Sequence, residues 1–117
     1  MATLEMIRSR LDFAALQTDA RSRPDPMLVL RYRRNGLDRT RFGISAGRRT
    51  GTAVVRNTIR RRLRRVIVSL LERINPGWDV LIIARPAAAQ ASQADLATVF
   101  ERLMNKAGLL SSESVAR

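Results

Sequence analysis

Two stretches in the first half of the chain alternate between large apolar side chains and smaller or charged ones. They are residues 27–33 (MLVLRYR) and residues 40–46 (TRFGISA). Alternation with a period of two is typical of β-strands that bury one face. The dipeptide Asn35-Gly36, a common centre of tight turns, lies between the two stretches. We therefore expect the two strands to pair directly as a hairpin.

From about residue 54 the apolar period becomes helical. The apolar stripe consists of Val55, Ile59, Leu63, Val66, Ile67, Leu70 and Ile74. Such a stripe predicts a long amphipathic helix, which the turn residues Asn75-Pro76-Gly77 end. Residues 79–85 (DVLIIAR) follow without alternation and predict a strand that is covered on both faces.

Two more helices are marked by N-terminal capping boxes, in which a hydroxyl residue is followed three positions later by an acidic one. Ser9 and Asp12 open the first helix, and Ser92 and Asp95 open the last. Gly108 is suited to end the last helix, because glycine readily adopts the left-handed conformation common at helix ends.

The predicted order is helix, strand, strand, helix, strand, helix, with a proline-containing loop over residues 20–26. This order predicts an α+β fold, a small α/β sandwich with helices packed on a sheet. The chain has 117 residues, enough for one domain with a single modest core. We expect residues 111–117 to form a frayed tail.

The charge of the chain indicates what kind of partner it binds. The formal net charge is +12, and ten arginines but no carboxylate lie between Asp38 and Glu72. On the long helix, neighbours such as Arg60 and Arg64 repel each other and oppose helix formation slightly. A bound polyanion offsets that cost, whereas a merely solvated helix face usually mixes charges of both signs. The basic and amide residues expected to contact the polyanion are Arg48, Arg49, Arg56, Asn57, Arg60, Arg61, Arg64 and Arg65.

RNA is the polyanion that these residues favour. An A-form helix presents phosphates and 2′-hydroxyls more readily than base edges. A membrane-surface helix would carry bulky apolar anchors, and the strongest apolar run, residues 80–84, is too short to span a bilayer. We expect a cytoplasmic protein without membrane contact.

The residues give no indication of an active site in this chain. Cysteine and histidine are both absent, which excludes thiol nucleophiles, imidazole bases and Cys/His metal sites. The ten carboxylates are dispersed, whereas a two-metal nuclease needs them clustered. The residues alone therefore predict an RNA-binding domain with no catalytic residues, and a ribosomal-protein-like binder fits them as well.

Residues 43–64, GISAGRRTGTAVVRNTIRRRLR, resemble the bacterial ribonuclease P protein component. Arg48-Arg49 match the basic pair of that family, and Arg56-Asn57 match the start of its basic helix. Arg60, Arg61 and Arg64 take the basic positions that follow. The resemblance extends more loosely from about residue 11 to residue 110. The family has a second motif arginine where this chain has Thr58, and Arg62 or Arg65 could offset the loss.

The resemblance implies a fold and a division of labour. The fold would be ribosomal-protein-S5-domain-2-like, in the order α-β-β-(β)-α-β-α with about four strands, over a core of roughly residues 9–110. The basic helix would dock on the catalytic RNA of ribonuclease P, and a cleft beside the first helix would hold the 5′ leader of precursor tRNA. Phe13 matches an aromatic residue of that cleft, although the residues alone fit a core position for Phe13 equally well, and Gln17 stands where a second aromatic is often found.

The resemblance also places the chemistry outside the protein. The catalytic RNA would cut the leader with magnesium that is mainly RNA-bound, and the protein would bind no metal and no small-molecule cofactor itself. A ribosomal-protein-like RNA binder with no role in cleavage, and a stand-alone nuclease, remain the competing interpretations.

Overall fold

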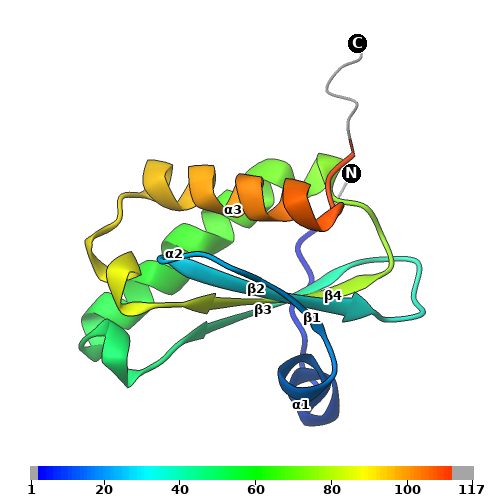
Figure 1. Ribbon diagram of the computed structural model, residues 1–117, viewed down its shortest axis with the longest axis horizontal. Helices are drawn as coiled ribbons and strands as arrows, with labels where there is room; N and C mark the ends of the chain where they lie inside the picture. Colours follow the sequence, from blue (N-terminus) through cyan, green and yellow to red (C-terminus); the bar gives the residue numbers. More distant parts are fainter. Residues whose placement is uncertain (1–2, 112–117) are drawn as a thin grey trace.

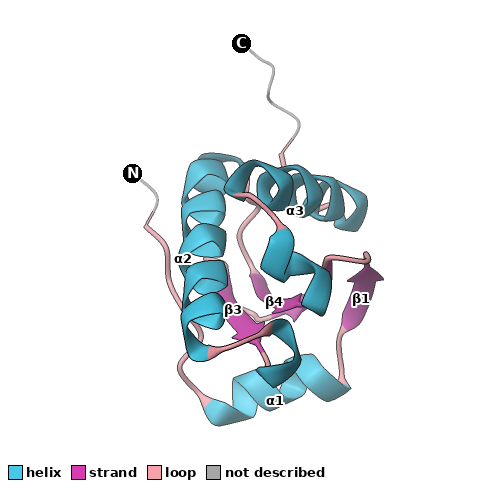
Figure 2. Cartoon of the chain, turned by 90° about the vertical axis from the view of Figure 1, so that its left-hand side faces the viewer, coloured by secondary structure: helices cyan, strands magenta, loops and turns pink. Residues whose placement is uncertain are grey.

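The computed structural model describes residues 3–111, which form a four-stranded sheet with helices on both faces (Figure 1). The strands are β1 (Arg21–Pro24), β2 (Leu28–Arg34), β3 (Arg41–Ala46) and β4 (Trp78–Ala84). The helices are α1 (Arg10–Thr18), α2 (Ala53–Leu70) and α3 (Gln93–Ala107), with short 3-10 turns η1 (Arg48–Thr50), η2 (Leu71–Arg73) and η3 (Pro86–Gln90). Helices α2 and α3 cover one face of the sheet, and α1 lies on the other (Figures 1 and 2). The predicted α+β sandwich with about four strands is confirmed.

The predicted hairpin is wrong. The strand order is β1-β2-β4-β3, so β4 lies between the two strands that were expected to pair. It is antiparallel to β2 and parallel to β3. The local turn does form, with Gly36 at a φ of 72°. However, the backbone N–H of Asn35 donates to the carbonyl of Gly77, just before β4, at 3.0 Å. The chain therefore turns after β2 without pairing β2 to β3.

The order α-β-β-(β)-α-β-α implied by the resemblance is confirmed, but the residue pattern missed strand β1, because the expected loop over residues 20–26 contains it. Its four residues are all exposed, so no apolar alternation marks it. It pairs with β2 in antiparallel register, from Arg21 opposite Tyr32 to Pro24 opposite Val29. Proline is compatible with this position because β1 is an edge strand.

The core lies between the sheet and the helices α2 and α3. Phe42, Val80 and Ile82 of the sheet and Ile59 and Phe100 of the helices belong to one buried cluster. Strand β4 is also covered on its other face, since Leu81 is fully buried there. The prediction of a strand covered on both faces is therefore confirmed.

The helix ends follow the sequence signals closely. Ser92 and Asp95 form the complete capping box of α3, and Gly108 ends that helix at a φ of 77°. Ser9 caps α1 by accepting from the N–H of Asp12 at 3.3 Å. Helix α2 ends at Leu70 and continues as η2, a few residues before the predicted end.

The segments that flank the secondary structure are also tied to it. The chain before α1 runs along the outer edge of β3, where Ile7 donates to Phe42 and Phe42 donates to Glu5 through backbone hydrogen bonds. The predicted frayed tail lies outside the described residues except for Ser111, whose N–H donates to the carbonyl of Arg73.

Candidate nucleic-acid interface

Four arginines and one asparagine of α2 line an open hollow of about 510 Å³ on the side of the helix turned away from the core. These residues, which we call the α2 arginine face, are Asn57, Arg60, Arg61, Arg64 and Arg65. They lie opposite the buried side chains of the same helix, such as Ile59 and Leu63. The 3.6-residue period therefore separates an aliphatic stripe from a cationic one, as the sequence predicted.

Contacts within the protein orient one arginine of this face. Arg60 donates to the Oδ1 atom of Asn57 at 3.1 Å and to the backbone carbonyl of Ala46 at 3.4 Å. Both acceptors are uncharged, so the guanidinium keeps its full positive charge. Ala46 ends β3, and Arg60 is therefore fixed relative to the sheet as well as to its own helix.

The entry to α2 extends the positive surface. Arg48 and Arg49 are exposed on η1, immediately before the helix. Gly51 turns the chain into α2 at a φ of 144°, and a Cβ atom there would lie 2.9 Å from the Cγ1 atom of Val55. The first turn of α2 contains no acidic residue, so the positive end of the helix dipole is not neutralised locally.

Arg56 completes the basic cluster, the name we give to Arg48, Arg49, Arg56 and the α2 arginine face, but its environment differs from that of the other members. It is half-buried, and its Nε atom is buried without a hydrogen-bond partner within the protein. An unsatisfied buried donor is unfavourable, so this Nε atom destabilises the described chain unless it gains an acceptor.

Ion pairs distinguish some of the described arginines from those on and before α2. Five form ion pairs with carboxylates: Arg33 with Asp19, Arg39 with Glu5 and Asp38, Arg41 with Asp79 and Asp12, Arg73 with Glu101, and Arg102 with Asp25. Within residues 3–111, no carboxylate lies within 4.0 Å of a guanidinium of the α2 arginine face, Arg48, Arg49 or Arg56. The predicted contact residues therefore carry uncompensated charge.

Thr58 and Arg62 have internal partners. The hydroxyl of Thr58 donates to the carbonyl of Val54, one turn earlier in α2, at 3.0 Å. Arg62 donates to the carbonyl of Ala91, between η3 and α3, at 2.7 Å. Arg62 therefore ties α2 to the next segment of the chain, whereas Arg65 lies on the arginine face. Of these two arginines, only Arg65 lines the α2 hollow.

Phe13 lies on the opposite face of the sheet and is half-buried. A Cβ atom on Gly43 would lie 2.9 Å from the Cε2 atom of Phe13 and 3.3 Å from the Cδ1 atom of Leu81. Gly43 therefore makes room for the aromatic ring on the surface of β3. Phe13 is outside the core between the sheet and α2 and α3. Gln17 is exposed one turn further along α1.

A strip of the same sheet face is only partly covered. Val29, Ile83 and Ser45 are cross-strand neighbours in β2, β4 and β3, and all three are half-buried. They share the face of Leu81, because residues two apart in a strand point to the same side. We call these three residues the outer strip. It lies one register position from Ala46, the end of β3, which leads into η1.

Arginines of the sheet anchor α1 above this face. Arg31 of β2 donates to the carbonyls of Leu16 and Gln17 at 2.6 Å and 3.2 Å. Arg41 of β3 contacts Asp12 of α1 at 3.2 Å. These bonds fix the C-terminal and N-terminal parts of α1, so the position of Phe13 is set from both ends of its helix.

The described part of the chain offers neither a metal site nor a membrane-spanning helix. Among residues 3–111, no group of three or more acidic, histidine or cysteine side chains is placed to hold a metal ion. Over the same residues, none of the helices combines the length and the apolar character needed to cross a bilayer.

Comparison with known proteins identifies the family. The family model described as ribonuclease P matches residues 1–108. The ribonuclease P protein component of Roseiflexus castenholzii is 36% identical over 105 residues, which cover 89% of this chain and 86% of the relative. That of Symbiobacterium thermophilum is 36% identical over 108 residues, which cover 92% of this chain and 94% of the relative.

Solved structures agree with the fold. The ribonuclease P protein of Staphylococcus aureus superposes with a TM-score of 0.84 at 24% identity and covers 93% of this chain and 100% of its own. The protein from Thermotoga maritima superposes with a TM-score of 0.77 at 25% identity, covering 86% of this chain and 96% of its own. The chain therefore belongs to the ribonuclease P protein family, the protein component of the ribonucleoprotein endonuclease that processes the 5′ end of tRNA.

Proposed function

We propose that the α2 arginine face, together with Arg48, Arg49 and Arg56, docks on the catalytic RNA of ribonuclease P in the cytoplasm. The observation that carries this proposal is that many arginines without a carboxylate partner are concentrated on one surface. Those of the basic cluster are unpaired within the described chain and gather on and before one helix. Holding like charges together is unfavourable unless a polyanion binds them.

Arginine suits this task because its planar guanidinium binds phosphate oxygens in two-pronged fashion. The hollow between Arg60, Arg61, Arg64 and Arg65 is open and shallow, as a surface that follows an RNA backbone requires. Phosphate contacts alone position the protein without reading sequence. Docking through this face therefore depends on the shape of the RNA.

The 5′ leader of precursor tRNA would lie on the other face of the sheet, beside Phe13 and over the outer strip. An extended single strand needs a surface that is partly apolar, for bases, and flanked by cations. Phe13 and Ile83 supply the apolar part, and Arg48 and Arg49 follow the end of β3. Gln17, exposed on α1, offers an amide for hydrogen bonding in place of a stacking ring.

Magnesium would act in the assembled ribonucleoprotein, bound mainly by RNA. The contribution of the protein would be electrostatic: arginines beside RNA phosphates reduce the repulsion between the catalytic RNA and precursor tRNA. Fewer divalent ions are then needed to hold the two RNAs together.

The test is cleavage of precursor tRNA by the catalytic RNA at low magnesium, with and without the protein. The variant is Arg60→Gln/Arg61→Gln/Arg64→Gln. The matched control is Arg8→Gln/Arg23→Gln/Lys106→Gln, which removes the same charge from three exposed side chains outside the α2 arginine face. We expect stimulation by the wild type and the control, and loss of stimulation in the variant.

Two results would contradict the proposal. If the wild-type protein binds RNA but does not stimulate cleavage, the protein is a basic RNA binder with another role. If the variant and the control lose stimulation equally, net charge matters and the α2 arginine face does not.

A further inference from the structure

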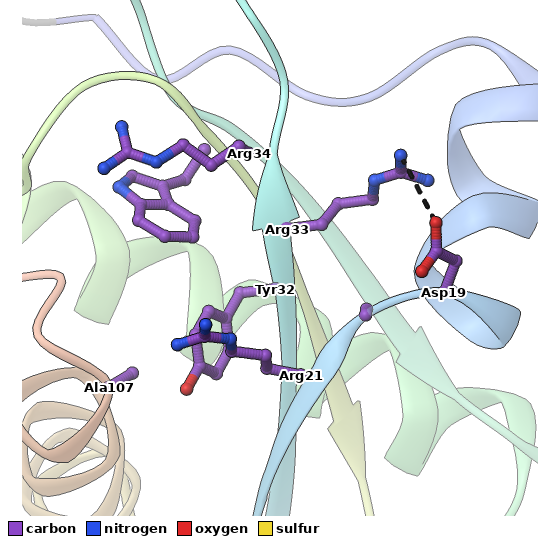
Figure 3. Close-up of a pocket in the computed structure, with 8 residues that line it drawn as sticks. Asp19, Arg21, Tyr32, Arg33, Arg34 and Ala107 are labelled. Atoms are coloured by element: carbon purple, nitrogen blue, oxygen red, sulfur yellow. Dashed lines mark ion pairs between the residues drawn. The ribbon is translucent and has the colours of Figure 1, made fainter.

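A second hollow, of about 720 Å³, lies at the end of the sheet where β2 ends and β4 begins (Figure 3). It is lined by Asp19, Ala20, Arg21, Tyr32, Arg33, Arg34, Trp78 and Ala107. We call it the Trp78 pocket. Its residues come from β1, β2, β4 and the ends of α1 and α3, so no single stretch of sequence indicates it. The register places it away from η1, since Arg34 pairs with Trp78 at this end of β4 and Ala46 pairs with Ala84 at the other.

Aromatic side chains form one wall of the Trp78 pocket. The rings of Tyr32 and Trp78 meet edge to face, with centroids 5.8 Å apart and planes at 61°. The Cζ atom of Arg34 lies 4.6 Å from the centroid of the Trp78 ring. A guanidinium over an indole is attracted by the electrons of the ring face. Trp78 therefore holds the exposed Arg34 side chain against the pocket wall.

The other side chains make the Trp78 pocket cationic. Arg21 is the cross-strand partner of Tyr32 and is exposed. Arg33 lies 3.6 Å from Asp19, whose side chain is 82% exposed (dashed line in Figure 3). An ion pair that exposed to solvent is weak and readily exchanged for another anion. On the side of Trp78 the pocket thus offers Arg21 and Arg34, whereas Arg33 borders it from the other side of β2, beside the one carboxylate of the lining.

We propose that the Trp78 pocket binds an unpaired ribonucleotide. Its base stacks on one face of the Arg34 guanidinium, whose other face lies on the ring of Trp78, and a flanking phosphate contacts Arg21. Stacking of bases on aromatic rings and on arginine planes is the usual way in which proteins hold single-stranded RNA. A simple anion would need the arginines but not the aromatic wall, and an apolar ligand would not favour these cations.

The surroundings of the pocket favour the leader of precursor tRNA as the source of this nucleotide, an inference that rests on the proposed function. A smaller hollow of about 140 Å³ lies beneath α1 and is lined in part by Asp12, Arg33 and Arg34. Arg33 and Arg34 border both hollows. A single strand that passes under α1 would therefore reach the Trp78 pocket without leaving the protein surface. The catalytic RNA is the other possible source.

The binding of the nucleotide can be followed directly, because Trp78 is the only tryptophan of the chain. The probe is a short single-stranded oligouridylate, titrated against the fluorescence of Trp78. The variants are Arg34→Lys, which keeps the charge but loses the planar group, and Arg21→Gln. The matched control is Arg23→Gln, which removes an exposed arginine of the same strand outside the pocket.

We expect saturable quenching in the wild type and weaker binding in Arg34→Lys, on the order of fivefold. Arg21→Gln should bind more weakly than Arg23→Gln. Equal affinities in the wild type and Arg34→Lys would overturn the proposal, because charge alone would then explain binding. Equal losses in Arg21→Gln and Arg23→Gln would overturn it too, since the pocket would contribute nothing beyond net charge.

The source of the nucleotide is distinguished with the assembled ribonucleoprotein. If it belongs to the leader, Arg34→Lys should weaken binding of precursor tRNA with a long leader and leave binding of mature tRNA unchanged. If it belongs to the catalytic RNA, the same variant should weaken assembly and leave the preference for the leader unchanged.

The proposed nucleotide site and the proposed function can fail separately. If the wild-type protein stimulates cleavage and Arg34→Lys matches it in every assay, the nucleotide site is refuted and the proposed function stands. Failure of the wild type to stimulate would refute the proposed function itself.

Discussion

Arg41 holds the buried carboxylate of Asp79 through two parallel hydrogen bonds. Its Nε atom donates to Oδ1 at 2.9 Å, and its Nη2 atom donates to Oδ2 at 2.7 Å. The amide of Asn35 donates to the same Oδ1 atom at 3.0 Å. The pair joins neighbouring positions of β3 and β4, and Arg41 reaches on to Asp12 of α1. It thereby links the sheet to the helix that carries Phe13.

Asp79→Ala should lower the free energy of unfolding by about 3 kcal/mol, because it leaves the largely buried guanidinium of Arg41 with the more exposed Asp12 as its remaining charged partner. The double variant Arg41→Met/Asp79→Leu should recover most of that loss, since it removes both charges and fills the space. Urea denaturation of the three proteins measures the difference. If the double variant is less stable than Asp79→Ala, the ion pair stabilises the fold beyond the neutralisation of two buried charges, and this account is wrong.

The same pair should keep its effect as the solution becomes alkaline. The hydrogen bond to Asp79 raises the pKa of Arg41 above its ordinary value, and the nearby charges of Asp79 and Asp12 act in the same direction while burial opposes them. A raised pKa stabilises the fold below the unfolded-state pKa and loses that effect only as the pH rises through the folded-state pKa. The stability difference between wild type and Asp79→Ala should therefore not shrink between pH 7 and about pH 10. A marked decrease in that range would contradict this account.

Gly43→Ala should displace Phe13, because the new Cβ atom would meet the ring edge at 2.9 Å. The backbone of Gly43 is not in the left-handed region, so the penalty is steric. We expect a loss of about 1–3 kcal/mol in unfolding free energy. Phe13→Leu in the Gly43→Ala background should relieve the clash. Thermal denaturation of the single and double variants tests this, and an unchanged melting temperature in Gly43→Ala would contradict it.

Arg62 and Arg64 are two arginines of α2 that can be compared directly, because Arg62 donates to a backbone carbonyl and Arg64 lines the open hollow. Arg62→Gln loses the bond to Ala91 and should cost about 1–2 kcal/mol of stability. Arg64→Gln should leave stability within about 0.5 kcal/mol and weaken binding to the catalytic RNA. It should also reduce the slope of log affinity against log salt by about 0.7–0.9. Denaturation and salt-dependent RNA binding, measured on both variants, check the assignment. Equal effects on RNA binding would contradict the separation of roles.

Periodicity in the sequence predicted most of the elements but not their arrangement. The helical stripe of α2 and the alternation in β2 and β3 are local properties, and both were recovered. Pairing is not local: the turn at Asn35-Gly36 is compatible with a hairpin, yet β4 takes the place beside β2. Strand β1 is held by its backbone bonds to β2 at an exposed edge, so its side chains gave no signal.

The candidate site was predictable to a similar extent. The spacing of Arg60, Arg61, Arg64 and Arg65 sufficed to place them on one helix face. Distinguishing Arg62 from them required the position of Ala91, which is distant in sequence. The Trp78 pocket combines residues from five elements and could be recognised only once the sheet order was known.

The sheet order also determines when this protein can fold during its synthesis. Strand β4 is one of the two inner strands, yet it is the last of the four to leave the ribosome, after the whole of α2. Until residues 78–84 emerge, β3 has no partner strand beside it, and the β1–β2 ribbon is too small to be stable alone. The nascent chain thus exposes its unpaired arginines before it has a core. The late strand would complete the sheet in a single cooperative step. The arginines of the nascent chain are therefore accessible to RNA before the sheet is complete.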